Sequence, residues 1–317
     1  MTTSAYDSGV AADGASDLAT EERSSAVQVT IGLPVYNGER YLSEALDSIL
    51  GQTFRDFVLV VSDNASTDRT VEIVESYAAL DDRVVLLRSP VNRGAAWNFN
   101  RTFEVCRSPY FKWAAADDLM APTCVERCLD TLTQAPPSVV LVYPRTRLID
   151  DEGREIGELV DKLATAPDAP VHARLKHVVA NAVYGNLAFA LMRSEALRRT
   201  RLHGSFPSSD YVLLAELALV GAFLEVPEYL FLRRDHADAS RRANVSLEEI
   251  SAWFDPTRPA VGHELAHVFR ECLVGISHAN LPPATRLLAY VTFLATWVRR
   301  TTQVRTRARR IFSSTRR

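Results

Sequence analysis

Strand and helix patterns alternate along the first half of the chain, and this order restricts the fold more than any other feature. Apolar residues alternate from Val27 to Leu33, which is the period of a strand. Leu42 to Leu50 repeats apolar residues at spacings of three and four, as on one face of a helix, and Phe57 to Val61 is an apolar run suited to a buried strand. Repeated units of this kind predict an α/β fold with a parallel sheet and right-handed crossovers, which binds ligands at the carboxyl ends of its strands.

The same reasoning places the remaining elements. We expect helices over residues 66–77, 95–106, 125–132 and 210–220, strands over residues 84–87, 110–114, 139–143, 223–226 and 229–233, and a helical tail from residue 261. The strands over 223–226 and 229–233 are expected to pair. Asp150 to Gly153 has the residues of a turn between two extended segments.

Composition and charge exclude several classes of protein. Of the 317 residues, 47% are hydrophobic and 24% are charged, as in a globular protein, and the net charge of -3 gives no reason to expect nucleic acid as a partner. The four cysteines lack C-x-x-C spacing, which predicts reduced thiols and a cytoplasmic location. Residues 1–25 contain no apolar stretch of a signal peptide and are expected to be a disordered leader.

The turns after the strands lack the common nucleotide-binding motifs. The first turn, Pro34-Val35-Tyr36-Asn37-Gly38, has one glycine where a dinucleotide site has G-x-G-x-x-G, and no P-loop sequence occurs. Acids follow the strands instead, with Asp63 after the second and Asp117-Asp118 after the fourth. Neighbouring carboxylates repel each other unless a cation lies between them, so these acids predict Mg²⁺ or Mn²⁺ bound together with a diphosphate. The alternative is that Asp117 and Asp118 form the first turn of a helix.

Five short motifs, in this order and spacing, resemble the family 2 glycosyltransferases of the GT-A fold, and the resemblance covers roughly residues 27–240. The motifs are residues 34–38 with Tyr41-Leu42, residues 48–54 (SILGQTF), residues 62–68 (SDNASTD), Asn92-Arg93-Gly94 with Asn98, and Ala116-Asp117-Asp118. The resemblance implies a Rossmann-like, mostly parallel sheet flanked by helices, with a C-terminal helical extension. It also implies an inverting enzyme that uses a nucleoside-diphosphate sugar, most often a UDP-sugar.

The resemblance assigns roles to residues of the first half. Pro34 and Tyr36 would line the base pocket, Asp63 would bond the base, Asp117 would face the ribose or donor sugar, and Asp118 would hold the metal. Tyr36 could instead belong to the core, although an aromatic side chain after a strand is well placed to stack on a base. Asp63 could instead cap the next helix. Arg93 would pair with phosphate or be solvated.

The resemblance also assigns the second half of the site. The family's catalytic base is an Asp near the start of a helix, often preceded by an acid, and Asp210 matches that location, although Ser209 stands where the acid would be. The alternative is that Asp210 is an N-cap. Arg234-Asp235-His236 is similar to the family's R-x-H segment, so His236 would be a third metal ligand or a phosphate contact, or else a solvent-exposed loop residue.

One motif points to another chemistry. His263-Glu264-Leu265-Ala266-His267 is an H-E-x-x-H sequence, which on a helix would bind zinc and use Glu264 as a base. Position 273, six residues after His267, is Leu, and Glu271 would have to be the third ligand. The motif lies outside the α/β body and explains none of the upstream pattern.

The C-terminal segment combines apolar and basic residues. Residues 281–317 contain nine Arg and no Asp or Glu, and Leu287, Val291, Leu294 and Val298 share one helix face. The segment around residues 287–298 is too short for a membrane span. It would contact an anionic membrane from the cytoplasmic side, a second subunit or the catalytic body.

These expectations define three domains and three candidate functions. The domains are the leader, a GT-A domain over 26–240 (nucleotide half 26–120, acceptor half 121–240), and a helical region over 241–317 with a basic tail. The main prediction is inverting transfer of a sugar from a nucleotide sugar to a glycan or lipid-linked hydroxyl in surface polysaccharide or glycolipid synthesis. The alternatives are a zinc metallohydrolase and a non-catalytic nucleotide-sugar binder, and oligomers are compatible with all three.

Overall fold

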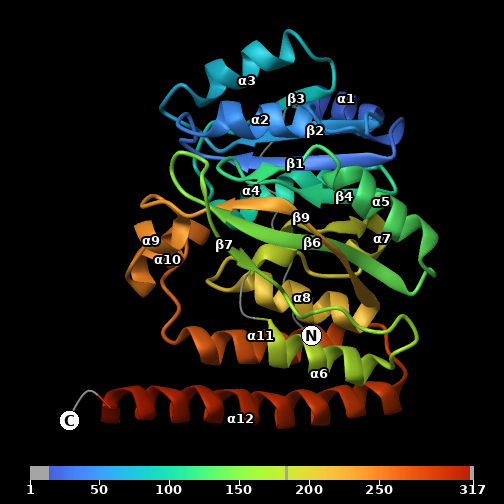
Figure 1. Ribbon diagram of the computed structural model, residues 1–317, viewed down its shortest axis with the longest axis vertical. Helices are drawn as coiled ribbons and strands as arrows, with labels where there is room; N and C mark the ends of the chain where they lie inside the picture. The colour runs from blue at the N-terminus through green and yellow to red at the C-terminus, as the bar shows by residue number, and fades with distance from the viewer. Residues whose placement is uncertain (1–13, 183–184, 315–317) are drawn as a thin grey trace.

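The computed structural model describes residues 14–182 and 185–314, and within them it contains one nine-stranded sheet. Its strand order is β3-β2-β1-β4-β8-β6-β9-β5, with β7 paired to β6. Figure 1 shows the strands stacked from β3 at the top to β7, with α6, α8, α11 and α12 at the lower end. The strands are β1 (Val29–Val35), β2 (Phe57–Asp63), β3 (Val84–Arg88), β4 (Tyr110–Trp113), β5 (Leu119–Met120), β6 (Val139–Ile149), β7 (Glu155–Leu159), β8 (Leu191–Arg193) and β9 (Ala222–Arg234).

Helices cover the sheet on both sides. They are α1 (Gly14–Ser25), α2 (Leu42–Leu50), α3 (Thr70–Ala78), α4 (Ala95–Glu104), α5 (Cys124–Gln134), α6 (Val171–Asn181), the 3-10 helix η1 (Gly185–Phe189), α7 (Ser194–Leu197), α8 (Ser209–Val220), α9 (Ser240–Ala243), α10 (Leu247–Phe254), α11 (Glu264–His278) and α12 (Pro283–Ser314). The predicted alternation of strands and helices through β4 is confirmed. The helix expected from residue 66 begins only at Thr70.

The first four strands in sheet order are parallel, as the sequence predicts, and the remainder is mixed. β1 pairs in parallel with β2 and β4, and β2 pairs in parallel with β3. β8 runs antiparallel to both β4 and β6, and β5 runs antiparallel to β9. Because β6 and β9 are parallel to each other, the sheet is mostly parallel. The predicted halves 26–120 and 121–240 share this one sheet, and their division remains a prediction.

The pair of strands expected over residues 223–226 and 229–233 is wrong. The structure has one strand, β9, which lies beside β6 along its whole length. Val226 is opposite Pro144 and Tyr229 is opposite Arg145, so Pro227 and Glu228 have no partner on β6. They form a bulge, which lets the strand continue past a proline.

The disordered leader expected over residues 1–25 is also corrected for residues 14–25, which form α1; residues 1–13 lie outside the described residues. Asp17 forms a bidentate ion pair with Arg101 of α4. The buried hydroxyl of Ser24 donates to the Val105 carbonyl at 2.9 Å and accepts from the Arg107 amide at 2.7 Å. These polar contacts hold a helix whose sequence has little apolar periodicity.

The core lies on both faces of the sheet because alternate strand residues point in opposite directions. Val29, Ile31 and Leu33 pack against α2 and α5 in one cluster. On the opposite face Phe111 and Trp113 pack with residues of α4, α6 and α8.

His203 belongs to the second face of the core. Its ring lies 4.9 Å from the rings of both Phe99 and Trp113, and its Nε2 is buried without a hydrogen-bond partner among the described residues. Burial lowers the pKa of His203 to about 4. The folded protein therefore holds this imidazole neutral at neutral pH.

Acidification should destabilise the protein through His203. Its folded pKa lies below the unfolded value of about 6.5, so the unfolded state binds the extra proton, and stability falls as the pH drops from about 6.5 toward 4. The loss from this group approaches about 3 kcal/mol at pH 4. Urea unfolding of the wild type and of His203→Phe measures this loss. The difference between their free energies of unfolding should change with pH between about 6.5 and 4, and a difference that does not depend on pH would contradict a neutral His203.

Candidate functional site

The loops after β1 and β2 are joined to each other by polar side chains. The Asn37 amide donates to Ser66 Oγ and its side-chain oxygen accepts from the Thr67 amide, both at 2.8 Å. The Gly38 amide donates to Thr70 Oγ1 at 2.8 Å. Asn37 has φ 52, a left-handed conformation that Asn tolerates. Several residues of the sequence motifs therefore shape the carboxyl edge of the sheet.

Two buried asparagines hold the ends of the strands. Asn98 of α4 donates through Nδ2 to the carbonyls of Val35 and Ser62, at 3.1 and 2.9 Å. Asn64 donates to Asn92 Oδ1 at 2.9 Å and so joins the loops after β2 and β3. The polar residues after three neighbouring strands thus form one rigid edge.

The residues predicted to bind the nucleotide lie on this edge. Tyr36 follows β1 and is 47% exposed, which contradicts a place in the core. Pro34 is buried within β1 opposite Ser62. Asp63 is buried at the end of β2, and its carboxylate accepts from the Ser66 amide at 3.2 Å. Asp63 thus caps the turn that begins the loop, while α3 begins later.

Arg93 lies in the loop after β3 and stacks on an aromatic ring. Its guanidinium carbon is 4.9 Å from the centre of the Trp97 ring. The next residue, Gly94, has φ 84, and a Cβ there would lie 2.3 Å from the Phe254 carbonyl oxygen. The C-terminal helix α10 therefore packs directly on the Asn92-Arg93-Gly94 loop.

Asp117 and Asp118 lie between β4 and β5, so they are not the first turn of a helix. Asp118 is 9% exposed and its Oδ1 accepts from the Arg234 amide at 2.8 Å. Burial, and then the charge of Asp117, raise the pKa of Asp118 well above its usual value. Asp117 is more exposed, and its Oδ2 lies 2.9 Å from His236 Nε2.

Arg234 at the end of β9 connects the Asp117-Asp118 turn to two other segments, the turn after β6 and α2. Its side chain is fully buried. It donates to the carbonyls of Asp117, Asp150 and Asp151 at 3.0, 3.2 and 2.9 Å, and to Glu44 Oε2 of α2 at 2.7 Å. A guanidinium can satisfy this many acceptors because its donors are fixed in one plane.

Tyr41 covers this arrangement. Its ring stacks 4.5 Å below the Arg234 guanidinium and meets the His236 ring edge-on at 4.9 Å. Its hydroxyl lies 2.5 Å from Asp151 Oδ1, and burial with this hydrogen bond raises the pKa of Tyr41 to about 12. His236 is 5% exposed, so the expectation of a solvent-exposed loop histidine is wrong.

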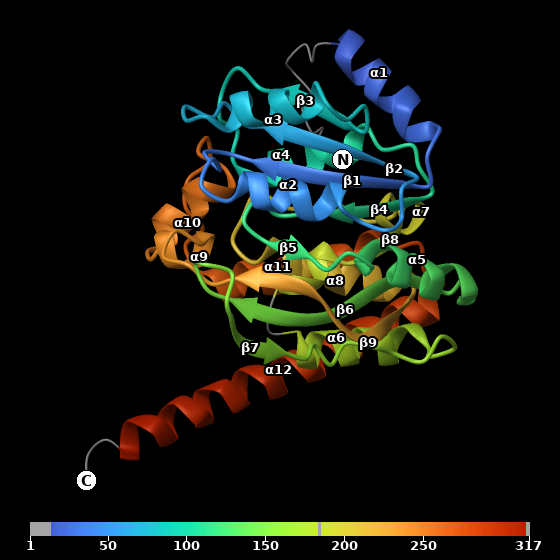
Figure 2. The same ribbon diagram turned by 45° about the horizontal axis from the view of Figure 1, so that its top comes forward.

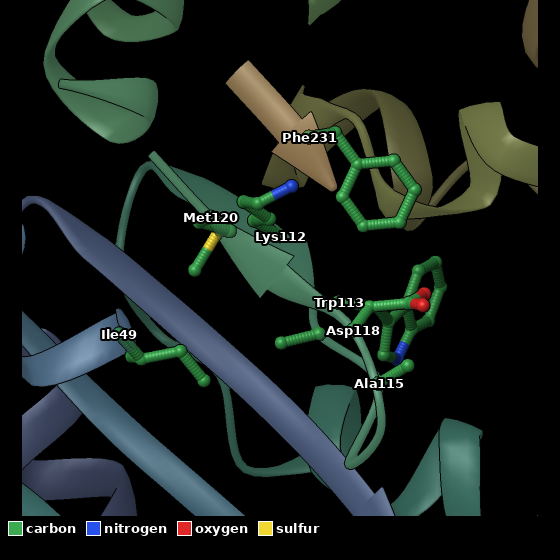
Figure 3. A pocket seen from close by; sticks show the side chains of 8 residues that line it. Ile49, Lys112, Trp113, Ala115, Asp118, Met120 and Phe231 are labelled. Atoms are coloured by element: carbon green, nitrogen blue, oxygen red, sulfur yellow. The ribbon is translucent and has the colours of Figure 1, made fainter. Parts of the chain in front are cut away.

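The pocket behind Asp118 is narrow and mostly apolar. Figure 3 shows Asp118 beside Trp113, with Phe231 and Met120 on the other walls. Lys112, buried on the same wall, donates to the Phe189 carbonyl and lies 5.7 Å from the Phe231 ring centre. These apolar neighbours contribute to the burial that raises the pKa of Asp118.

The donor atoms at this edge fit a divalent cation shared with a substrate. The described residues contain no group of three or more His, Cys, Asp or Glu side chains that could hold a metal by themselves. Mg²⁺ and Mn²⁺ commonly use one or two carboxylates and complete their shell with phosphate oxygens. Asp117 and Asp118 supply such carboxylates. His236 adds a buried Nδ1 without a hydrogen-bond partner in the described part of the chain.

Asp210 lies in the first turn of α8, and Ser208 is the N-cap, so the N-cap alternative for Asp210 is wrong. Gly221 alone joins α8 to β9. The chain therefore turns back on itself, and the N-terminus of α8 points toward the carboxyl end of β9. Asp117 contacts His236, the adjacent Asp118 accepts from the Arg234 amide, and Asp63 ends the parallel strand β2 at the same edge of the sheet, while a place of Asp210 beside them remains a prediction.

The H-E-x-x-H segment is used for helix packing. His263 is the N-cap of α11, with φ -156 and ψ 108, and its Nδ1 accepts from the Ala266 amide at 3.4 Å. Glu264 accepts from Ser208 Oγ at 2.5 Å, and Glu271 pairs with Arg201 at 2.8 Å. Because His263 precedes the helix, the two imidazoles do not share a helix face, and the geometry does not support the zinc alternative.

Sequence reasoning missed a second polar group, next to Arg234. Arg233 donates to Asn186 Oδ1 at 2.8 Å, and Asn186 donates to Asp161 Oδ2 at 3.3 Å. Burial raises the pKa of Asp161, and the positive charge of Arg233 partly opposes that rise, as it does at Asp118. The only sequence signal was the Arg-Arg pair before His236, since Asp161 and Asn186 lie in segments without a motif.

Comparison with known proteins decides the family. Residues 30–200, more than half of the chain, match the sequence profile described as Glycosyl transferase family 2. The chain belongs to this family. The resemblance inferred from the five motifs is thereby confirmed.

Curated relatives support the same family. Chondroitin synthase of Escherichia coli is 26% identical over 261 residues, which are 82% of this chain and 35% of that protein. An uncharacterized glycosyltransferase of Rickettsia typhi is 32% identical over 128 residues, which are 40% of this chain and 39% of that protein. The chain thus spans 35 to 39% of the length of these two relatives.

Solved structures confirm the GT-A fold. S. aureus TarS 1-349 in complex with UDP-GlcNAc has a TM-score of 0.62 and 17% identity, and the match covers 85% of this chain and 72% of that one. Mannosyltransferase PcManGT of Pyrobaculum calidifontis, in complex with GDP-Man and Mn²⁺, has a TM-score of 0.54 and 18% identity over 92% of both chains.

Replacing Arg234 with lysine should destabilise the protein by about 2–4 kcal/mol. A lysine keeps the charge but cannot satisfy the buried carbonyls that the guanidinium binds. The matched control is Arg40→Lys, because Arg40 is 55% exposed and pairs with exposed acids, so its loss should stay under about 0.5 kcal/mol. Urea unfolding of both variants checks this prediction. Equal losses of unfolding free energy in the two variants would contradict a structural role for the buried Arg234 guanidinium.

Proposed function

We propose that this protein transfers a sugar, with inversion, from a nucleoside-diphosphate sugar to a hydroxyl group of an acceptor. The observation that carries the proposal is the cluster of Asp117, Asp118 and His236 at the carboxyl edge of the sheet in a family 2 glycosyltransferase. Structures with the same fold hold UDP-GlcNAc in one case and GDP-Man with Mn²⁺ in another, which supports a nucleotide-sugar donor.

The donor would lie across the ends of β1, β2 and β4. Tyr36 is exposed and follows β1, so its ring is available to stack on the base, while Asp63 offers a carboxylate at the end of the neighbouring strand. Pro34 is buried in β1, so it would shape the backbone next to the base pocket and would not itself contact the base. Arg93, held over Trp97, would place a positive charge near the phosphates.

Asp117 and Asp118, with His236, would hold a divalent cation against the diphosphate. Such an ion offsets the negative charge that develops on the leaving diphosphate. Asp117 also fixes His236 through the 2.9 Å hydrogen bond, and Arg234 fixes Asp118 through its amide. Burial and the charge of Asp117 raise the pKa of Asp118 although Arg233 and Arg234 oppose the rise, so a bound cation would be the partner that favours the ionised carboxylate.

Asp210 would take the proton from the acceptor hydroxyl. Inversion requires a base on the side of the sugar opposite the leaving group, and the direction of α8, whose N-terminus points toward the carboxyl end of β9, supports this assignment. By analogy with chondroitin synthase and TarS, we infer a polysaccharide or lipid-linked glycan as the acceptor and UDP as the preferred nucleotide.

Asp210→Asn should abolish transfer and preserve donor binding. Loss of a general base lowers the rate by about a hundredfold to ten-thousandfold, whereas an asparagine leaves the donor contacts in place. The measurement is release of nucleoside diphosphate from a panel of nucleotide sugars, with donor affinity followed by calorimetry. The matched control, Asp130→Asn on the exposed face of α5, should behave as the wild type. Donor binding without turnover in the wild type itself would favour the non-catalytic binder.

Asp118→Asn should remove most of the effect that Mn²⁺ has on nucleotide binding. A ligand that binds only the folded state raises the melting temperature, so UDP with Mn²⁺ should stabilise the wild type more than UDP alone. The variant should lose most of the Mn²⁺-dependent part of that shift, because it lacks one of the anionic oxygens that a hard cation prefers. A Mn²⁺-dependent shift of full size in Asp118→Asn would contradict the assigned ligand.

A further inference from the structure

Over residues 283–301, the part of helix α12 whose side chains the structure describes, one face packs on the body. Ala289 and Phe293 are fully buried, and the Phe293 ring stacks on Phe269 of α11 at 5.5 Å. Arg300 donates to the carbonyls of Val179 and Ala182 at the end of α6, at 2.6 and 2.7 Å. These contacts fix the orientation of the helix, so its other face is turned away from the body.

The outward face of α12 presents a row of large apolar side chains. The row consists of Leu287, Leu288, Val291, Leu294 and Val298, which are between 43% and 65% exposed. Spacings of four, three and four residues place Leu287, Val291, Leu294 and Val298 along one line of a helix. We call these five residues the apolar row. A row of this length on a water-soluble surface marks a contact site.

The charge of the same segment indicates what covers the row. Residues 281–317 contain nine Arg and no Asp or Glu, in a protein whose net charge is -3. The basic residues are concentrated after the apolar row, from Arg299 onward. An apolar face followed by a segment rich in arginine and free of acids in sequence suits a surface that is both apolar and anionic, which is the composition of a membrane interface with acidic lipids.

The other two occupants considered from sequence fit less well. The body already occupies the opposite face of the helix, through Ala289 and Phe293. A second copy of this chain would bring two basic segments together with no acid on either helix to offset the repulsion. In the described part of the chain no helix is long and apolar enough to cross a membrane, so the contact would be at the surface.

We propose that α12 lies on an anionic lipid bilayer, with the apolar row among the acyl chains and the arginines at the headgroups. Figure 1 and Figure 2 show the C-terminal part of α12 extending past the body on the side toward which β1 and β9 point. The carboxyl edge with the candidate site therefore lies on the side of the molecule to which the basic end of the helix extends. A lipid-linked acceptor at that bilayer would be within reach of the site.

Vesicle flotation of the full chain tests the proposal without donor or acceptor, so its outcome is independent of the proposed catalysis. The protein should float with phosphatidylcholine vesicles that contain phosphatidylglycerol, bind weakly to pure phosphatidylcholine, and lose binding at high salt. Leu287→Gln/Leu294→Gln should lower partitioning by on the order of a hundredfold, because two apolar side chains no longer enter the acyl region. Both side chains are exposed, so circular dichroism and thermal melting should be unchanged.

The matched control is Leu80→Gln/Val91→Gln. These residues are 90% and 53% exposed after α3 and β3, away from α12, and the double variant should float as the wild type does. Equal flotation of the wild type and the Leu287→Gln/Leu294→Gln variant would overturn the proposal. It would equally be overturned if the wild type failed to float and instead formed dimers that the same double variant abolishes, since the row would then bind a second copy.

Discussion

The buried Arg234 side chain is the interaction on which the candidate site depends. It joins the end of β9 to the Asp117-Asp118 turn, to the turn after β6 and to α2, and it stacks on Tyr41. A buried charge is tolerated only when its donors are satisfied, so these segments must come together for the chain to fold. The geometry that supports Asp118 and His236 is therefore a condition of stability, present before any ligand binds.

The fold could be predicted where local periodicity determines it. The parallel strands β1 to β4 are short, mostly apolar segments separated by amphipathic helices, and no long-range information is needed to recognise them. β9 was misjudged because Pro227 breaks its pattern, and only pairing with β6 keeps the strand continuous. Residues 14–25 were misjudged because α1 is held by an ion pair with Arg101 and by hydrogen bonds of Ser24, which connect distant parts of the chain.

The sequence could locate the candidate site, but it could not separate the residues that shape the site from those that face a ligand. Acids that follow parallel strands must share one edge, so Asp63, Asp117 and Asp118 could be assigned to it. The sequence could not show which motif residues shape the loops and which face a ligand. Asn37 and Asn98 form hydrogen bonds to other parts of the edge, whereas Tyr36 remains exposed. His236 was expected beside Asp118 as a metal ligand, but its hydrogen bond is to Asp117. These hydrogen bonds join residues 30, 63 and 119 positions apart, which motif spacing alone does not predict.

The most direct test of the account is the position of manganese in crystals of the protein grown with UDP and Mn²⁺, measured by anomalous diffraction. The account predicts one anomalous peak bonded to carboxylate oxygen of the Asp117-Asp118 pair and to a phosphate oxygen of UDP, with the uracil near Tyr36 and Asp63. A peak at the His263-His267 segment, or UDP bound away from the carboxyl edge of β1 and β2, would contradict it.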